Sequence, residues 1–157
     1  MKLTALTLAA ALLAGTAMAD GMVAPSDVKF DGSAVDQALT GTPGDPVEGQ
    51  SIYASKKKGN CVACHKISSV DANFPGNVGP PLDGVGDRYS TAELRGLLVD
   101  SKKTFDGTVM PAYYKVDGFI RPGKAYTGTA ADDTFGPLLS AQQVEDVVAF
   151  LSTLKDE

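Results

Sequence analysis

The clearest hydrophobic periodicity lies near the C-terminal end of the sequence. Apolar residues recur there at the i, i+3, i+4 and i+7 spacing of one helix face. The stripe consists of Val144, Val147, Val148, Leu151 and Leu154, flanked by Phe150. Ser140 precedes it, and Gln143 follows three residues later, as in an N-terminal capping box. The pattern predicts an amphipathic helix that begins after Ser140.

A shorter apolar stripe predicts a second helix. Leu94, Leu97 and Leu98 share one helix face, and Ser90 and Glu93 precede them at capping-box spacing. This pattern indicates a helix that begins after Ser90.

A first helix is predicted from Asp45, because Asp45 can cap it, Pro46 suits the first helical position and Glu48 completes a capping box. Its buried face is predicted to contain Gly49, Ile52 and Tyr53. We expect Lys56, Lys57 and Lys58 at its C-terminal end, where cations favour the helix dipole, and Gly59 to stop it.

Long segments rich in glycine and proline separate these helices. Residues 71–87 and 106–139 are predicted loops, and residues 113–128 could hold a short hairpin. Residues 20–44 are predicted to form an extended N-terminal arm, either a floppy terminus or a segment that wraps the body or a partner. The pattern predicts an all-α protein with three or more helices and long loops. Its hydrophobic core would be thin, so a group other than the side chains can fill part of it.

Composition excludes several functions. The 157 residues include 14 Lys and Arg against 19 Asp and Glu, a net charge of -5 that argues against nucleic acid as a partner. Two cysteines are too few for a multi-disulfide scaffold or a four-thiolate metal site. One histidine, His65, excludes any site that needs two imidazoles from this chain.

The first 19 residues have the organisation of a secretory signal peptide. Lys2 precedes an apolar stretch over residues 3–14, and an Ala-Met-Ala tripeptide ends at Ala19. We therefore predict cleavage after Ala19, export to the periplasm, an extended arm and then one folded domain over residues 45–157. An uncleaved membrane anchor is the alternative, although the stretch is short for a span and no second apolar stretch follows.

Both cysteines and the only histidine lie within five consecutive residues. Cys61-Val62-Ala63-Cys64-His65 matches C-x-x-C-H, the attachment signature of c-type haem. Two thiols at this spacing can form thioethers with the two vinyl groups of one porphyrin, while His65 is held beneath the iron. A redox-active dithiol and a structural disulfide are the alternatives.

The sixth iron ligand has to come from elsewhere in the chain. The predicted mature chain contains two methionines, Met22 near its start and Met110 in a loop before a proline. We predict Met110 as the second axial ligand; a core-filling role for Met110 or a vacant site are the alternatives. The Pro80 carbonyl in Gly79-Pro80-Pro81-Leu82 is a candidate acceptor for the second ring nitrogen of His65, although this segment could be only a turn.

Residues 48–154 resemble a class I cytochrome c. In that family an N-terminal helix crosses the C-terminal helix at a glycine and aromatic contact, which Gly49, Tyr53, Phe150 and Leu151 match. Its G-P-x-L loop is matched at residues 79–82. The resemblance implies that the Pro80 carbonyl accepts from His65 and that Met110 is the distal ligand of one covalent haem c.

Four segments are more specific. Residues 60–65, 76–82, 110–114 and 139–151 together resemble the SoxX family, the small monohaem subunits of SoxAX cytochromes. The resemblance implies a heterodimer with a larger haem subunit, SoxA, which oxidatively couples thiosulfate to a cysteine of the carrier SoxYZ. The complex is then an L-cysteine S-thiosulfotransferase. This chain supplies no catalytic residue and passes electrons to a downstream cytochrome.

Two other functions fit the residues. A diffusible periplasmic cytochrome c would shuttle electrons alone, and a haem enzyme or sensor would keep an open distal site. Tyr113, Tyr114, Arg88 and Arg95 are either contacts of the haem edge or propionates, or ordinary core aromatics and surface charges. The run at residues 56–58 could steer an acidic redox partner or be a solvated helix end.

Overall fold

The computed structural model describes residues 21–124 and 127–156, which contain four α-helices and one pair of two-residue strands. The helices are α1 (Pro46–Ala54), α2 (Val85–Arg88), α3 (Thr91–Asp100) and α4 (Ala141–Ser152). Short 3₁₀ helices span Pro25–Asp27, Cys61–Ala63 and Ser101–Lys103. The expected all-α class is confirmed, and the predicted signal peptide lies outside the described residues.

Helices α3 and α4 begin where the sequence predicts. Ser90 and Ser140 each accept from the backbone N–H three residues later, and Glu93 and Gln143 reach back to the cap N–H groups. Both capping boxes are therefore complete. Helix α4 ends at Ser152, so Leu154 packs against the core from beyond the helix.

Helix α1 differs from its prediction at both ends. Asp45 caps it by accepting from the Val47 N–H at 2.8 Å, but the Asp45 N–H donates to Asp146 of α4 instead of to Glu48. The helix ends at Ala54, before the lysine run, because Ser55 is extended and its carbonyl accepts from Asn60 in a tight turn. The expectation that the three lysines lie on the helix end was wrong.

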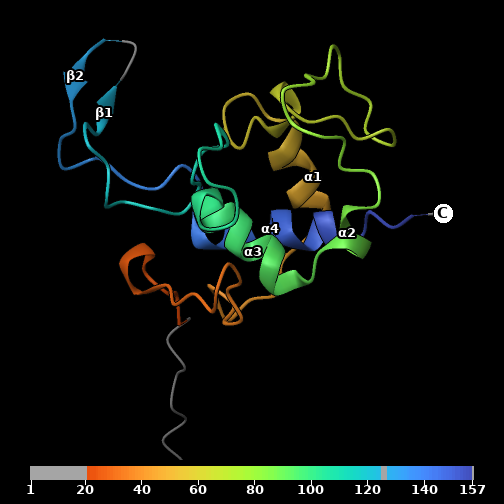
Figure 1. Cartoon of the computed structure of the whole chain (residues 1–157), viewed down its shortest axis with the longest axis horizontal. Helices are drawn as coiled ribbons and strands as arrows, with labels where there is room; N and C mark the ends of the chain where they lie inside the picture. Colours follow the sequence, from red (N-terminus) through yellow and green to blue (C-terminus); the bar gives the residue numbers. More distant parts are fainter. Residues whose placement is uncertain (1–20, 125–126, 157) are drawn as a thin grey trace, which may run out of the picture.

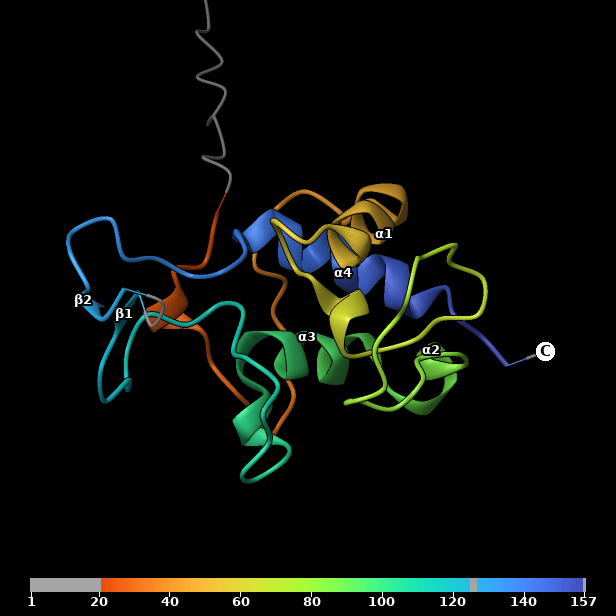
Figure 2. The same ribbon diagram turned by 90° about the horizontal axis from the view of Figure 1, so that it is seen from above.

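Helix α1 crosses α4 at a glycine, as expected from the resemblance (Figures 1 and 2). A Cβ atom on Gly49 would lie 2.0 Å from the carbonyl oxygen of Asp146, so no larger residue fits at this crossing. The rings of Tyr53 and Phe150 pack beside it with centroids 5.9 Å apart. The crossing fixes α1, and with it the start of the segment that carries the cysteines.

Residues 21–44 lie against the helical body. Val35 and Leu39 are fully buried, and their N–H groups donate to Ala92 and to the Glu145 carboxylate. A Cβ atom on Gly96 of α3 would lie 1.9 Å from the carbonyl oxygen of Ser33, so the arm touches the helix backbone directly. This geometry is that of a wrapped segment.

The predicted loop at 106–139 contains the only strands of the described residues. Strand β1 (Gly123–Lys124) pairs antiparallel with β2 (Thr129–Ala130), with Gly123 opposite Ala130. The hairpin overlaps the C-terminal end of the 113–128 region that the sequence suggested, because β1 lies inside that region and β2 begins one residue beyond it. Figures 1 and 2 show it standing away from the helices. No helix in the described ranges is long and apolar enough to cross a membrane.

Candidate haem site

The C-x-x-C-H motif forms a single tight turn beside a loop. Asn60 adopts a left-handed conformation (φ 49°), and the N–H groups of Cys64 and His65 both donate to the Cys61 carbonyl. The turn places both thiols and the imidazole on the same cavity. The two thiols are not joined in a disulfide.

Residues 76–82 hold the imidazole from the other side. The Gly76 and Gly79 N–H groups donate to the Val62 and Cys64 carbonyls, which ties the loop to the motif. The His65 Nδ1 atom lies 2.8 Å from the Pro80 carbonyl oxygen. This distance allows Nδ1–H to donate and leaves Nε2 free to bind a metal.

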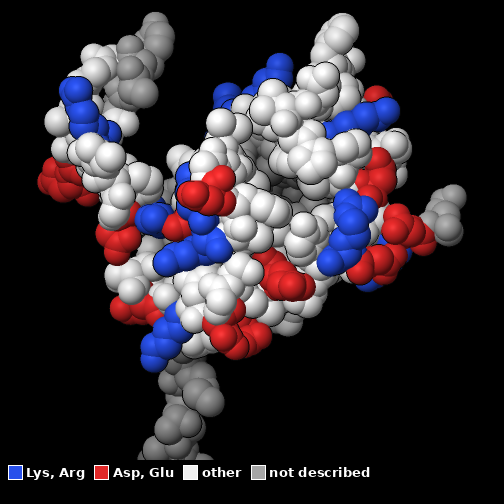
Figure 3. Space-filling view, viewed as in Figure 1, with Lys and Arg blue, Asp and Glu red and all other residues white. Residues whose placement is uncertain are grey.

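The cavity combines metal-ligand chemistry with apolar walls. Cys61, Cys64, His65 and Met110 all line it. Its apolar wall comes from α2, α3 and α4 and includes Val85, Leu94, Leu97, Leu98, Val147 and Leu151. Figure 3 shows a hollow on this face of the molecule, rimmed mainly by uncharged atoms. Two thiols, an imidazole and a thioether around an apolar space fit a covalently attached haem.

Burial keeps the Cys61 thiol protonated. Desolvation is the main cause that raises its pKa to about 11, and the neighbouring Cys64 thiol adds a smaller rise. The thiolate is the form that reacts in dithiol redox proteins, where the attacking cysteine has a lowered pKa. Cys61 therefore lacks the lowered pKa that marks an attacking cysteine.

Two tyrosines brace the motif. The Tyr53 hydroxyl donates to the His65 carbonyl at 2.6 Å, and the Tyr113 hydroxyl donates to the Gly59 carbonyl at 3.1 Å. Burial raises the pKa of Tyr53 to about 12 and raises the pKa of Tyr113 further, so both hydroxyls remain donors at neutral pH. The role of Tyr53 was missed because helix spacing shows only that it is buried.

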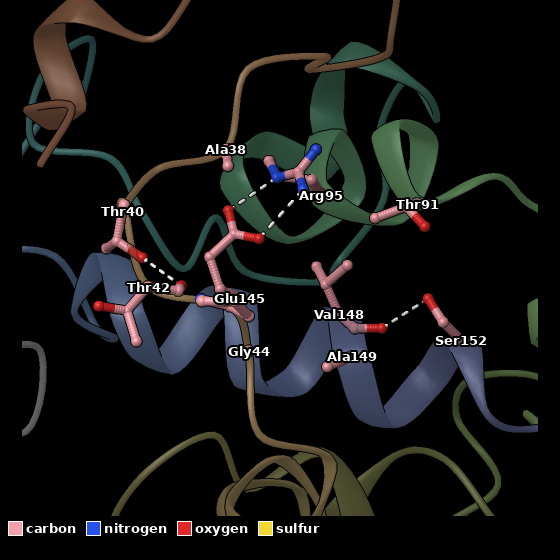
Figure 4. Close-up of a pocket in the computed structure, with 12 residues that line it drawn as sticks. Ala38, Thr40, Thr42, Gly44, Thr91, Arg95, Glu145, Val148, Ala149 and Ser152 are labelled. Carbon is pink, nitrogen blue, oxygen red and sulfur yellow. Dashed lines mark hydrogen bonds and ion pairs between the residues drawn. The ribbon is translucent and has the colours of Figure 1, made fainter. Parts of the chain in front are cut away.

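The remaining candidate contacts separate into different places. Tyr113 lines the cavity, whereas the Tyr114 hydroxyl donates to the Val23 carbonyl of the arm. Arg88 is exposed and donates to the Asp83 and Pro81 carbonyls. Arg95 does not line the haem cavity. It is buried beside a separate groove between the arm, α3 and α4 (Figure 4), where it pairs with Glu145 at 2.7 Å. Both roles predicted for Arg95, a contact of the haem and a charge on the surface, were therefore wrong.

Comparison with known proteins agrees with this geometry. Residues 46–155 match the cytochrome c family, and the chain belongs to that family. A solved structure, the crystal structure of SoxXA from P. pantotrophus, matches at 53% sequence identity with a TM-score of 0.82, covering 86% of this chain and 99% of the matched chain. The expected resemblance to SoxX is confirmed. Among curated proteins, none matches this chain.

Membership of the cytochrome c family implies a covalently bound haem c, with which Cys61 and Cys64 are consistent. Among the described residues, no group of three or more His, Cys, Asp or Glu side chains could hold a metal ion.

A single added methyl group tests how tightly the imidazole is held. A Cβ atom on Gly79 would lie 2.2 Å from His65 Cε1, so Gly79→Ala forces the ring or the loop to move. We expect the free energy of unfolding to fall by about 1–3 kcal/mol and the haem absorption spectrum to change. The matched control is Gly136→Ala, because a Cβ there meets only the Thr134 carbonyl, 4.0 Å away. Equal unfolding free energies and equal spectra in the two variants would contradict the close packing of Gly79 against His65.

Proposed function

We propose that this chain is the electron-transfer subunit of a SoxAX-like complex. The main support is that both cysteines, the only histidine and Met110 line one apolar cavity. In addition, the chain is 53% identical to one chain of SoxXA. In the proposal the chain is exported after cleavage behind Ala19, and residues 45–157 form its cytochrome domain.

One haem c is proposed, held by thioethers from Cys61 and Cys64, with His65 and Met110 as axial ligands. A bound haem c supplies reversible one-electron transfer at its iron. His65 presents Nε2 because the Pro80 carbonyl accepts from Nδ1–H. A thioether opposite an imidazole raises the reduction potential, which suits an electron acceptor.

The apolar walls exclude water from the site. A cavity lined by helix α3 and α4 leucines and valines lowers the local dielectric and so limits reorganisation of solvent when an electron arrives. Both thiols are consumed in attachment and His65 is consumed in ligation, so this chain keeps no thiol or imidazole for sulfur chemistry.

We therefore assign the sulfur chemistry to the partner. SoxA, the larger haem subunit, is proposed to couple thiosulfate to a cysteine of SoxYZ. The complex then acts as an L-cysteine S-thiosulfotransferase in the periplasm, and this chain relays the electrons released to a downstream cytochrome.

Co-purification tests this assignment. The full-length chain, tagged at its C-terminus and produced in a thiosulfate-oxidising host, is expected to retain a larger haem protein that intact-mass analysis identifies as SoxA. Isolation only as a stable monomer would reject the subunit assignment in favour of the diffusible shuttle.

The exposed lysine run offers a separate test of partner steering. Lys56, Lys57 and Lys58 lie in the turn between α1 and the haem motif, all exposed. Replacing all three with Gln is expected to slow association with an acidic redox partner several-fold at low ionic strength and to flatten its salt dependence. The exposed Lys29→Gln variant serves as the control. Unchanged, salt-independent rates in the triple variant would eliminate steering by this run.

A further inference from the structure

The segment that carries Met110 runs beside the C-terminal end of α3 in a defined register. The Tyr113 N–H donates to the Leu98 carbonyl at 2.9 Å, and the Tyr114 N–H donates to the Val99 carbonyl at 3.4 Å. The next side chain, Lys115, forms an ion pair with Asp100 at 2.7 Å. Three successive residues of the segment are therefore tied to three successive residues of the helix.

The Met110 backbone is held by a different set of donors. Ser101 Oγ donates to the Met110 carbonyl oxygen at 2.8 Å, and the Lys102 ammonium group donates to the same oxygen. A carbonyl oxygen has two lone pairs, so these two donors satisfy it. The Met110 N–H donates to Thr108 Oγ1 at 3.2 Å. Both polar groups of the Met110 backbone thus have side-chain partners.

The two donors to the carbonyl differ in their environment. Ser101 is fully buried (0% exposed), so water cannot replace its hydroxyl as the donor. Lys102 is exposed, and water competes with its ammonium group. Pro111, the next residue in the chain, has no N–H group and so adds no backbone hydrogen bond that could hold this part of the segment. The buried Ser101 bond is therefore the stronger anchor of Met110.

We infer that Ser101 and Lys102 are positioning residues that hold the Met110 thioether toward the haem cavity. Ser101 contributes most, through Met110 and without touching the haem iron. The inference rests on the proposed ligation by Met110. It gives the buried hydroxyl at the end of α3 a functional role that no sequence motif marks.

Competition by imidazole measures how firmly Met110 is held. In the full-length ferric holoprotein, Ser101→Ala is expected to raise the apparent association constant of imidazole about five-fold, the factor of one ordinary net hydrogen bond. The charge-transfer absorption of the methionine–iron bond is expected to weaken in parallel. Lys102→Met is expected to raise the imidazole constant about two- to three-fold, since its bond is exposed to water.

Thr104→Val provides a matched control in the same turn. Thr104 Oγ1 is buried and has no hydrogen-bond partner among the described residues, so its removal breaks no bond to Met110. Thr104→Val is expected to leave the imidazole constant and the charge-transfer band unchanged. Thermal unfolding of all variants separates general loss of stability from loss of Met110 positioning.

Each outcome bears on a single claim. Equal imidazole constants in Ser101→Ala and Thr104→Val would overturn the inference while leaving the ligation by Met110 intact. Survival of the methionine–iron band in Met110→Ala would instead overturn the ligation proposed above. Where Ser101→Ala holoprotein does not accumulate, Lys102→Met decides, and an unchanged imidazole constant in that variant overturns the inference.

Discussion

Met110→Ala is expected to abolish the methionine–iron charge-transfer band and to make the sixth coordination position accessible to added imidazole. Met110 is half-buried and lines the same cavity as His65, so its removal takes away the thioether proposed as the axial ligand. The reduction potential is expected to fall by a sizeable part of the roughly 0.8 V range that axial ligands cover. Absorption spectroscopy and a redox titration of the holoprotein measure both effects.

Met22→Ala is the matched control for this substitution. Met22 is the other methionine outside the predicted signal peptide, is 65% exposed and does not line the cavity. Its removal is expected to leave the band and the potential unchanged. Loss of the band in Met22→Ala with its retention in Met110→Ala would reverse the ligand assignment.

The largest loss of stability is expected for Glu145→Ala. The Glu145 carboxylate accepts from Arg95 through both oxygens, at 2.7 and 3.0 Å (Figure 4). It also accepts from the Leu39 N–H at 2.8 Å. It therefore joins α4, α3 and the arm. Because Arg95 is only 6% exposed, removing Glu145 leaves a buried charge without its partner. We expect a loss of about 3–5 kcal/mol in a chemical denaturation experiment.

The double variant Arg95→Met with Glu145→Leu separates the two components of that loss. Apolar residues of similar volume remove the charge together with its partner, so most of the stability is expected to return. A double variant as unstable as Glu145→Ala would show that the lost Leu39 contact, and not the stranded charge, dominates. The exposed pair of Lys155 and Asp87 is the reference, and Lys155→Ala is expected to change stability little.

Local signals in the sequence predicted the helices well. Capping residues and apolar spacing act within a few residues, so Ser90 and Ser140 defined the starts of α3 and α4. The end of α1 was misplaced because the lysine run looked like a helix end, whereas the turn at Ser55 ends the helix earlier. Lysines are good helix formers, and nothing local in their sequence marks that turn.

Contacts between residues far apart in the sequence could not be predicted from local sequence patterns. Arg95 and Glu145 are 50 positions apart, and their pairing depends on how α3 packs on α4. The bond between Ser101 and Met110 depends on the register of a loop against a helix end. By contrast, the C-x-x-C-H motif identified the cofactor directly, because haem attachment requires those three side chains at one fixed spacing.

The central claim is that this chain receives the electrons released when thiosulfate is coupled to the carrier. Stopped-flow absorption of the purified ferric complex with SoxA, mixed with thiosulfate and SoxYZ, tests it most directly. The haem of this chain is expected to become reduced, and to stay ferric when the carrier is omitted. Formation of the coupled carrier while this haem remains ferric would contradict the account.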